Sequence, residues 1–427
     1  MKKKYFNILP VAAALFLLHT SFTGINLKNG IWLAKLKTAS GQYIPFNFEL
    51  KDSAGRKQMT VINGKERFKV TDITVKGDSV LIKMPLFDTE IRAALKENVL
   101  QGNWVRHIGS KNILIPFSAE ANASWRFFSS PAKPKFNISG RWSAVFTDED
   151  LQNKDVTVGE FRQNGNDITG TFLTTTGDYR FLQGTVSGDD LYLSCFDGSH
   201  AFLFTGKISN EQTITNGKFY SGASSVQVWN AVKDENAKLP DAYSLTVLKP
   251  GYKKIDFTFP DLDKKPVSLS DNQFKNKVVI LQIMGSWCPN CMDETAYLVG
   301  FYKKYHVKGV QVLGLAYERT TDFATSRKNI GQLKNRFHIP YDLLITGYTN
   351  NKNEAAKSLP ALSAFVAFPT TVIIDKKGDV RKIHTGFSGP GTGDHYIEFT
   401  HGFETLIDQL LAEKQALSSF KSTKDHL

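Results

Sequence analysis

The sequence predicts a multidomain protein, with an N-terminal all-β region followed by a C-terminal α/β domain. Up to about Val232 the chain shows short alternating segments separated by turn pairs such as Asn63-Gly64 and Asp197-Gly198. After that point, apolar strand-like runs alternate with stretches of helical spacing, which is typical of a sheet with both faces covered. A pair of cysteines at one strand-to-helix junction, Cys288 and Cys291, indicates where the chemistry lies.

Size and composition limit the possible functions of the protein. The 427 residues are enough for two or three domains, and 41% hydrophobic residues are enough for packed cores. The net charge of +12 is spread along the chain, without a Lys/Arg block or a recognisable nucleic-acid motif. We therefore expect no nucleic-acid partner, and interpret the basic balance as a general surface property.

The first 24 residues have the pattern of an export signal. Lys2, Lys3 and Lys4 form a charged start, and the apolar stretch Ile8 to Leu18 is too short for a comfortable membrane span. No cysteine lies near its end, which excludes a lipid-anchored cysteine, and the cleavage site is poor. The alternative is an uncleaved segment that tethers the protein to the membrane. In both cases we expect the body of the protein in the periplasm.

The all-β region is expected to form a sandwich or a barrel. Its clearest alternating segments are predicted strands: Tyr43 to Leu50, Phe68 to Val75, Ser79 to Met84, Asp167 to Thr174, Leu191 to Phe196 and Ala201 to Lys207. Cys195 shares strand parity with Leu191 and Leu193, so we interpret it as a small buried hydrophobe, the alternative being a free thiol that pairs with another protein.

This region also resembles a repeat. Gly30-Ile-Trp32 is similar to Gly140-Arg-Trp142, and Gly102-Asn-Trp104 is similar to Gly217-Lys-Phe219 at a comparable offset. We expect two related β units over 28–130 and 136–235, joined by 129–135. The alternative is that Gly-x-Trp simply recurs at strand starts.

Residues 236–252 are polar, contain Pro240 and Pro250, and are predicted to be a linker. The α/β domain then covers 253–415, with a polar tail over 416–427. Its expected elements are a hairpin (Phe257–Ser270), strands (Val278–Met284, Val310–Tyr317, Tyr341–Ile345, Thr370–Ile374, Val380–His384) and helices (Met292–Lys304, Phe323–Phe337, Asn353–Phe365, Glu398–Glu413).

The segment Trp287-Cys-Pro-Asn-Cys291 is predicted to be a redox site. Two cysteines three positions apart at a helix start lie close enough for a disulfide, and the unpaired N–H groups there lower the pKa of a thiol. Pro289 suits the first helical turn, where its missing N–H costs nothing. The alternatives are an inert disulfide or half of a zinc site. The chain has only three cysteines and no close His pair beside the motif, so we expect no metal.

Residues from about 253 to 415 resemble the TlpA- and ResA-like thioredoxin-fold oxidoreductases, which are exported bacterial thiol–disulfide enzymes. The resemblance rests on Phe259-Pro-Asp-Leu-Asp263, Trp287-Cys-Pro-Asn-Cys291, Glu294 and Phe368-Pro-Thr-Thr-Val-Ile-Ile-Asp375. It implies a thioredoxin-like fold for this part and does not extend to the β region.

The resemblance also implies roles for single residues. Cys288 would be the accessible, attacking thiolate and Cys291 the resolving thiol, with Trp287 shielding one side of the pair. Phe368 and Pro369 would form the cis-proline loop, which binds an extended client together with Pro289, Thr385 and Gly386. Thioredoxin proper has a buried Asp six residues before its first cysteine, and here Gln282 stands in that position.

Glu294 would correspond to the active-site glutamate of the family, a proton acceptor for Cys291. The alternative is a surface carboxylate favoured by the start of the helix. We expect its neighbour Asp293 to be solvated.

The expected function is an exported thiol–disulfide oxidoreductase that reduces protein disulfides with no cofactor beyond the Cys288–Cys291 disulfide. Its partners would be disulfide-bearing protein clients and an unidentified electron donor. Two alternatives are a β-domain binding module with a redox-inactive thioredoxin-like scaffold, and a peroxiredoxin-like peroxidase. The residues before Cys288 lack the Pro-x-x-x-Thr/Ser-x-x-Cys setting that a peroxidase needs.

Overall fold

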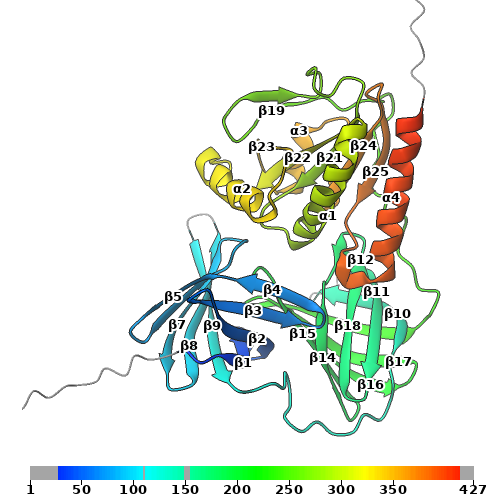
Figure 1. Cartoon of the computed structure of the whole chain (residues 1–427). Coiled ribbons are helices and arrows are strands. Elements are labelled where there is room, and N and C mark those ends of the chain that lie inside the picture. The colour runs from blue at the N-terminus through cyan, green and yellow to red at the C-terminus, as the bar shows by residue number, and fades with distance from the viewer. Residues whose placement is uncertain (1–26, 109–110, 149–153, 414–427) are drawn as a thin grey trace, which may run out of the picture.

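The computed structural model describes residues 27–108, 111–148 and 154–413 and comprises an all-β region and a C-terminal α/β domain (Figure 1). This confirms the predicted fold class. The predicted signal segment, 1–24, and the polar tail, 416–427, lie outside the described residues.

The first β unit is one antiparallel sheet in the order β4-β3-β2-β1-β9-β8-β7-β6-β5. Its strands are β1 (Gly30–Lys37), β2 (Tyr43–Ser53), β3 (Arg56–Asn63), β4 (Glu66–Val70), β5 (Asp72–Lys76), β6 (Ser79–Lys83), β7 (Thr89–Lys96), β8 (Val99–Ile108) and β9 (Lys111–Ala121). Alternate residues point into a common core, where Trp32, Phe46 and Trp104 are completely buried.

The second β unit is a barrel. Its sheet has the order β11-β10-β18-β17-β16-β15-β14-β12-β13, and a further pairing of β11 with β12 closes the ring. Its strands are β10 (Gly140–Asp148), β11 (Lys154–Asn164), β12 (Asp167–Thr174), β13 (Gly177–Asp178), β14 (Leu182–Ser187), β15 (Asp190–Phe196), β16 (Ala201–Asn210), β17 (Thr213–Ser221) and β18 (Ser225–Lys233). Cys195 is a free, fully buried cysteine of this core, as interpreted from its strand parity.

The two β units share their first-strand geometry. In each, the first strand lies between the second strand and the last one, and it opens with a glycine at positive φ, Gly30 at 118° and Gly140 at 119°. The indole N–H of Trp32 donates to the carbonyl of Lys28, and that of Trp142 donates to the carbonyl of Ile138, four residues earlier in both cases. These common features support the proposal of a repeat over the simple recurrence of Gly-x-Trp.

The prediction of one strand over Phe68 to Val75 is wrong. The chain breaks at Thr71 into β4, which pairs with β3, and β5, which pairs with β6. These two strands are the opposite edges of the sheet order. An alternating pattern gives the face on which a side chain lies, but it does not identify the neighbouring strand.

The C-terminal domain has a mixed sheet in the order β23-β22-β21-β24-β25 and a separate β19–β20 hairpin. Its elements are β19 (Thr258–Pro260), β20 (Pro266–Ser268), β21 (Val278–Met284), α1 (Pro289–Tyr305), η1 (His306–Lys308), β22 (Val310–Glu318), α2 (Phe323–Phe337), β23 (Asp342–Thr349), α3 (Lys352–Ser358), β24 (Thr370–Ile374), β25 (Val380–Thr385), η2 (Pro390–Thr392) and α4 (Asp394–Ala412). Side chains of α1, α2 and α4 share one core, and α3 and the hairpin share the core on the other face. None of the helices in these described ranges is long and apolar enough to cross a membrane.

The predicted helix over Asn353 to Phe365 is too long. Helix α3 ends at Ser358, and Leu359 has φ −129° and ψ 73°, outside the helical region. Pro360 follows directly, and the ring of a proline disfavours helical geometry in the residue before it. Helix α1, in contrast, begins earlier than predicted, because Cys288 caps it.

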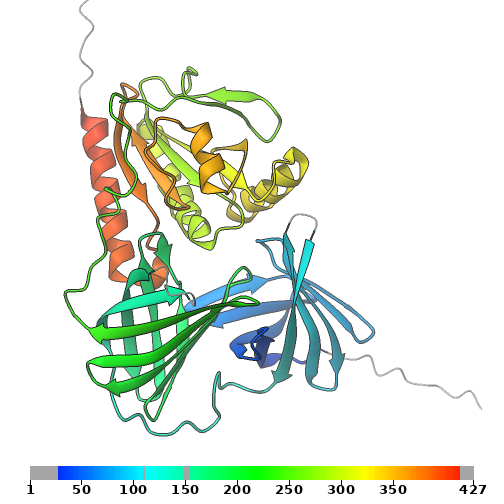
Figure 2. The ribbon, with the colours of Figure 1, turned by 180° about the vertical axis from the view of Figure 1, so that it is seen from behind.

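Both β units lie against the end of the C-terminal domain at which α1 begins (Figures 1 and 2). Contacts between α1 and the second β unit confirm this arrangement, for example the hydrogen bond from Asn290 Nδ2 to the carbonyl of Asp178, at 3.3 Å. The start of the helix that carries the cysteines therefore faces the β units.

Candidate active site

The two cysteines form a disulfide, Cys288–Cys291, with their Cα atoms 5.2 Å apart. The buried strand β21 delivers the chain to this point, and Cys288 is the N-cap of α1, with Pro289 in the first turn. The backbone N–H of Cys291 points at Sγ of Cys288, at 3.2 Å. After reduction, this N–H and the helix dipole would stabilise a thiolate on Cys288.

The accessibility of the sulfur pair is small. Cys288 is 5% exposed and Cys291 is completely buried. The first cysteine is therefore the more accessible one, as expected, but it is not freely open to solvent.

The cis-proline loop lies beside the disulfide. The Phe368–Pro369 peptide bond is cis, as expected, and the Phe368 carbonyl oxygen is 3.5 Å from Sγ of Cys288. The N–H of Gly386 donates to the carbonyl of Pro369, at 2.9 Å. The segments containing residues 288, 369 and 386 thus meet, which the sequence could only suggest through the family resemblance.

Trp287 packs beside this loop. Its ring stands edge-on to Phe368 with 5.5 Å between ring centroids, and its indole N–H donates to the carbonyl of Tyr317, at 2.9 Å. The guanidinium of Arg319 lies over the same ring, 5.4 Å from its centroid. These contacts fix the indole between the redox motif and the end of β22.

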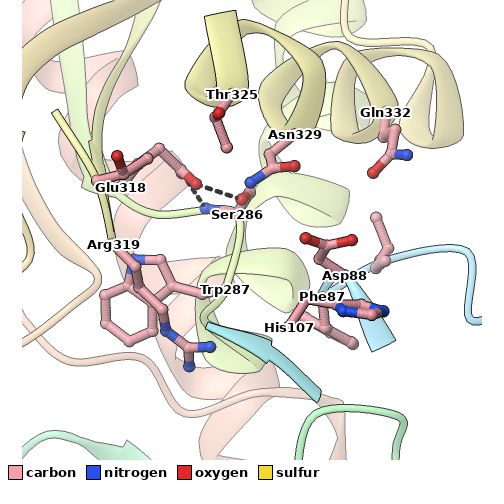
Figure 3. Close-up of a pocket in the computed structure, with 12 residues that line it drawn as sticks. Phe87, Asp88, His107, Ser286, Trp287, Glu318, Arg319, Thr325, Asn329 and Gln332 are labelled. Atoms are coloured by element: carbon pink, nitrogen blue, oxygen red, sulfur yellow. Dashed lines mark hydrogen bonds between the residues drawn. The ribbon is translucent and has the colours of Figure 1, made fainter. Parts of the chain in front are cut away.

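A pocket of about 220 Å³ begins at Ser286 and Trp287, just before the first cysteine (Figure 3). Glu318 forms part of its wall and accepts hydrogen bonds of 2.7 Å from both the N–H and the hydroxyl of Ser286. Burial raises the pKa of Glu318. The first β unit closes the pocket with the side chains of Phe87 and His107, so the β region is part of the surroundings of the redox motif.

Glu294 is buried, with 1% of its surface exposed, so the surface-carboxylate alternative is wrong. Gln282 Nε2 donates to one carboxylate oxygen at 2.9 Å, and Thr371 Oγ1 donates to the other at 2.6 Å. Burial raises the pKa of Glu294 to about 7, although both hydrogen bonds oppose the shift. A carboxyl with this pKa can accept and release a proton near neutral pH.

Gln282 connects this carboxylate to the second cysteine. Its Nε2 also lies 3.3 Å from the carbonyl oxygen of Cys291, and its Oε1 accepts a hydrogen bond from Thr295. The amide therefore fills the position of the thioredoxin aspartate with a neutral group that holds Glu294 in place.

Asp293 is not solvated, contrary to the prediction. It forms an ion pair with Arg180 of the second β unit, and burial raises the pKa of Asp293 to about 7 although Arg180 opposes the shift. The spacing of Asp293 within α1 could not reveal this, because its partner lies in another domain.

Thr385 and Gly386 contact the chain itself in this structure. The Thr385 hydroxyl donates to Oγ1 of Thr246. A Cβ atom added to Gly386, whose φ is 80°, would lie 3.0 Å from the backbone of Thr176. The close approach expected from this glycine thus occurs, and the approaching backbone is that of the second β unit.

Sequence reasoning missed Arg180, Asp178 and Thr371. Thr371 stands two residues after Pro369, and this proximity to the loop could have indicated it. Arg180 and Asp178 occur in a turn-rich stretch without a motif, so no local signal marks them.

The sequence of the C-terminal domain is similar to those of known thiol-disulfide oxidoreductases. The profile of the family described as Redoxin matches residues 249–396. These residues form a Redoxin domain. The chain is similar to the thiol-disulfide oxidoreductase ResA of Bacillus thuringiensis subsp. konkukian, with 34% identity over 125 residues, and to ResA of Geobacillus thermodenitrificans, with 29% identity over 133 residues. The matched segments cover 29% and 31% of this chain, and 63% and 66% of those relatives.

Solved structures similar to the Redoxin domain include a thiol:disulfide interchange protein from Chlorobium tepidum, with 18% identity and a TM-score of 0.28, covering 39% of this chain and 99% of that one. Another is a secreted thiol-disulfide isomerase from Corynebacterium glutamicum, with 20% identity and a TM-score of 0.30, covering 40% of this chain and 96% of that one.

Proposed function

We propose that this protein is an exported thiol–disulfide oxidoreductase that reduces disulfide bonds in protein clients. The observation that carries the proposal is the Cys288–Cys291 disulfide at the start of α1, beside the Phe368–Pro369 loop. The similarity of the Redoxin domain to relatives named as thiol-disulfide oxidoreductases supports the same reaction class.

The reaction starts from the dithiol form. The Cys288 thiolate attacks one sulfur of the client disulfide, so that a mixed disulfide forms and the other client sulfur leaves as a thiolate. Cys291 then loses its proton and attacks Sγ of Cys288. This releases the second client thiol and leaves the Cys288–Cys291 disulfide, with two electrons transferred to the client. A dithiol donor returns the pair to the reduced form.

Glu294 is the proposed acceptor of the Cys291 proton. Desolvation raises the pKa of a buried thiol, so the resolving step needs a base close to its helix face. Glu294 stands three residues after Cys291 and is buried like it. The side-chain amide of Gln282 donates both to the Glu294 carboxylate and to the backbone carbonyl of Cys291. Its pKa of about 7 suits this transfer.

The client segment would bind along the cis-proline loop of Phe368 and Pro369, next to Pro289 and to Trp287, whose ring packs against Phe368. Because Cys288 is 5% exposed, a narrow extended segment fits this site better than a folded surface. Thr385 and Gly386 would border the same site, because the N–H of Gly386 donates to the carbonyl of Pro369.

Export to the periplasm rests on the charged start and short apolar stretch within the first 24 residues. Cell fractionation of the full-length chain tests it. Recovery in the cytoplasm would contradict the localisation.

Trapping of a mixed disulfide tests the reaction. A Cys291→Ser variant cannot resolve the intermediate, so it should retain its client through Cys288 in a complex that reducing agent releases. The matched control Cys288→Ser should retain none, while Cys195 is present in both variants. Trapping on Cys195, or equal non-covalent client binding by both variants with no covalent complex, would favour the binding-module alternative.

A further inference from the structure

The second β unit reaches the two residues that separate the cysteines. Nη1 of Arg180 lies 3.3 Å from the carbonyl oxygen of Pro289, and Nδ2 of Asn290 donates to the carbonyl of Asp178, at 3.3 Å. Pro289 and Asn290 are the residues next to the two cysteines in the chain. Both are therefore in contact with another domain of the same protein.

Arg180 is buried, with 7% of its surface exposed, and is surrounded by carboxylates from all three parts of the chain. Its guanidinium pairs with Glu66 of the first β unit at 2.5 Å, with Asp197 of the second β unit at 3.3 Å, and with Asp293 of α1. A buried charge acts over several ångströms with little screening. The cluster therefore contributes to the potential at the neighbouring sulfurs.

The backbone around Arg180 is itself fixed. Arg180 has a positive φ of 59°, and its N–H donates to Oδ1 of Asp178, at 2.6 Å. The other oxygen of Asp178 accepts a hydrogen bond of 2.7 Å from the N–H of Gly389 in the Redoxin domain. The loop that presents the guanidinium is thus attached to the redox face at a second point.

We propose that Arg180 is a positioning residue of the dithiol site, whose docking against Pro289 sets the reduction potential of the Cys288–Cys291 pair. This inference rests on the proposed function. It makes the β region part of the redox centre: with Arg180 docked, a positive charge lies against the carbonyl of Pro289, the residue that follows Cys288, whose sulfur carries the negative charge after reduction.

The sign of the effect follows from the half-reaction. Two electrons and two protons convert the disulfide to the dithiol, and near neutral pH Cys288 gives one proton back as it becomes a thiolate. A cation stabilises this thiolate and favours the reduced state, while the carboxylates oppose it. Removing the cation should lower the reduction potential, and removing one carboxylate should raise it.

The experiment is a titration of the full-length chain in dithiothreitol redox buffers, with the reduced fraction read by alkylation and mass spectrometry. We expect Arg180→Gln to shift the equilibrium about tenfold toward the disulfide, which corresponds to roughly 30 mV for two electrons. The Cys288 thiol should also titrate at higher pH in this variant. Arg180→Lys keeps the positive charge, so its reduction potential should stay close to that of the unaltered chain.

Arg141→Gln is the matched control. Arg141 also connects the second β unit to the Redoxin domain, because its Nη2 lies 3.0 Å from Nε2 of His395. Within the described part of the chain its guanidinium otherwise bonds to Glu160 and to the carbonyl of Ala237, away from the cysteine motif. This variant should keep the original potential. Glu66→Gln should shift the potential in the opposite direction to Arg180→Gln, which a general loosening of the interface would not do.

Equal potentials in Arg180→Gln, Arg141→Gln and the unaltered chain would overturn the inference while leaving the proposed function intact. A shift of the same sign in Arg180→Gln and Glu66→Gln would also overturn it. If Cys288 and Cys291 fail to equilibrate with the redox buffer in the unaltered chain, the proposed function fails, and this inference fails with it.

Discussion

The hydroxyl of Thr371 donates a hydrogen bond of 2.6 Å to Oε1 of Glu294 and thereby connects the strand after the cis-proline loop to the cysteine-bearing helix. Gln282 donates to the second oxygen of the same carboxylate. Both oxygens of the proposed proton acceptor are therefore oriented by neutral donors, and burial raises its pKa.

This carboxyl should make the stability of the protein depend on pH. The pKa of Glu294 rises from an ordinary 4.5 to about 7 on folding, so between these pH values the folded chain holds a proton that the unfolded chain has lost. The free energy of unfolding should consequently fall as the pH rises through this window, by roughly 2–4 kcal/mol. In Glu294→Gln this decrease of the free energy of unfolding with pH should disappear. Denaturant titrations at several pH values measure it.

Glu211→Gln, at an exposed position of the second β unit, is the control and should leave the slope unchanged. An identical slope in Glu294→Gln and the unaltered chain would contradict the assigned pKa.

Thr371→Val should move the resolving step to higher pH. The substitution keeps the side-chain shape and removes a hydrogen bond that favours the ionised form, so the pKa of Glu294 should rise by about one unit. The measurement is the rate of client release from the mixed disulfide as a function of pH. Thr370→Val is the control, because the Thr370 hydroxyl donates to Ala367 and not to Glu294. Matching pH profiles for the two variants would speak against a role of Glu294 in this step.

Gly102→Ala and Gly217→Ala should each destabilise the β region by about 2 kcal/mol or more. A Cβ at Gly102 would lie 1.9 Å from the carbonyl oxygen of Arg92, and one at Gly217 would lie 2.4 Å from that of Trp229. Gly331→Ala, in α2 where a Cβ meets nothing within 4 Å, should instead stabilise its helix by about 1 kcal/mol. Thermal unfolding of the full chain distinguishes the three variants. Similar changes of the melting temperature in all three would refute the steric explanation.

Trp32→Phe and Trp142→Phe should cost similar free energies of unfolding, because the two indoles make the same hydrogen bond to the carbonyl four residues earlier. Each should cost about 1 kcal/mol more than Trp104→Phe. Trp104 is equally buried, but its Nε1 has no hydrogen-bond partner in the described structure. Denaturant unfolding provides the comparison, and a cost at Trp104 equal to the other two would show that volume alone matters.

Local sequence patterns predicted much of the Redoxin domain. The bounds of β21, α2 and β24 agree with the predicted segments, because an uninterrupted apolar run and a clear helical spacing each specify one local structure. The helix predicted over Asn353 to Phe365 failed at Pro360, where a local backbone constraint outweighed the periodicity.

What the sequence by itself determined is the cysteine motif: the two cysteines at the strand-to-helix junction are three positions apart, so their proximity follows from local backbone geometry. Only the tertiary structure decided the surroundings of that chemistry. Arg180 and Asp293 are 113 positions apart, and Arg180 and Glu66 are 114 apart, so no spacing in the chain relates them. Their pairing depends on how three separately folded parts pack, and burial at this junction gives the charges their effect on the sulfur pair.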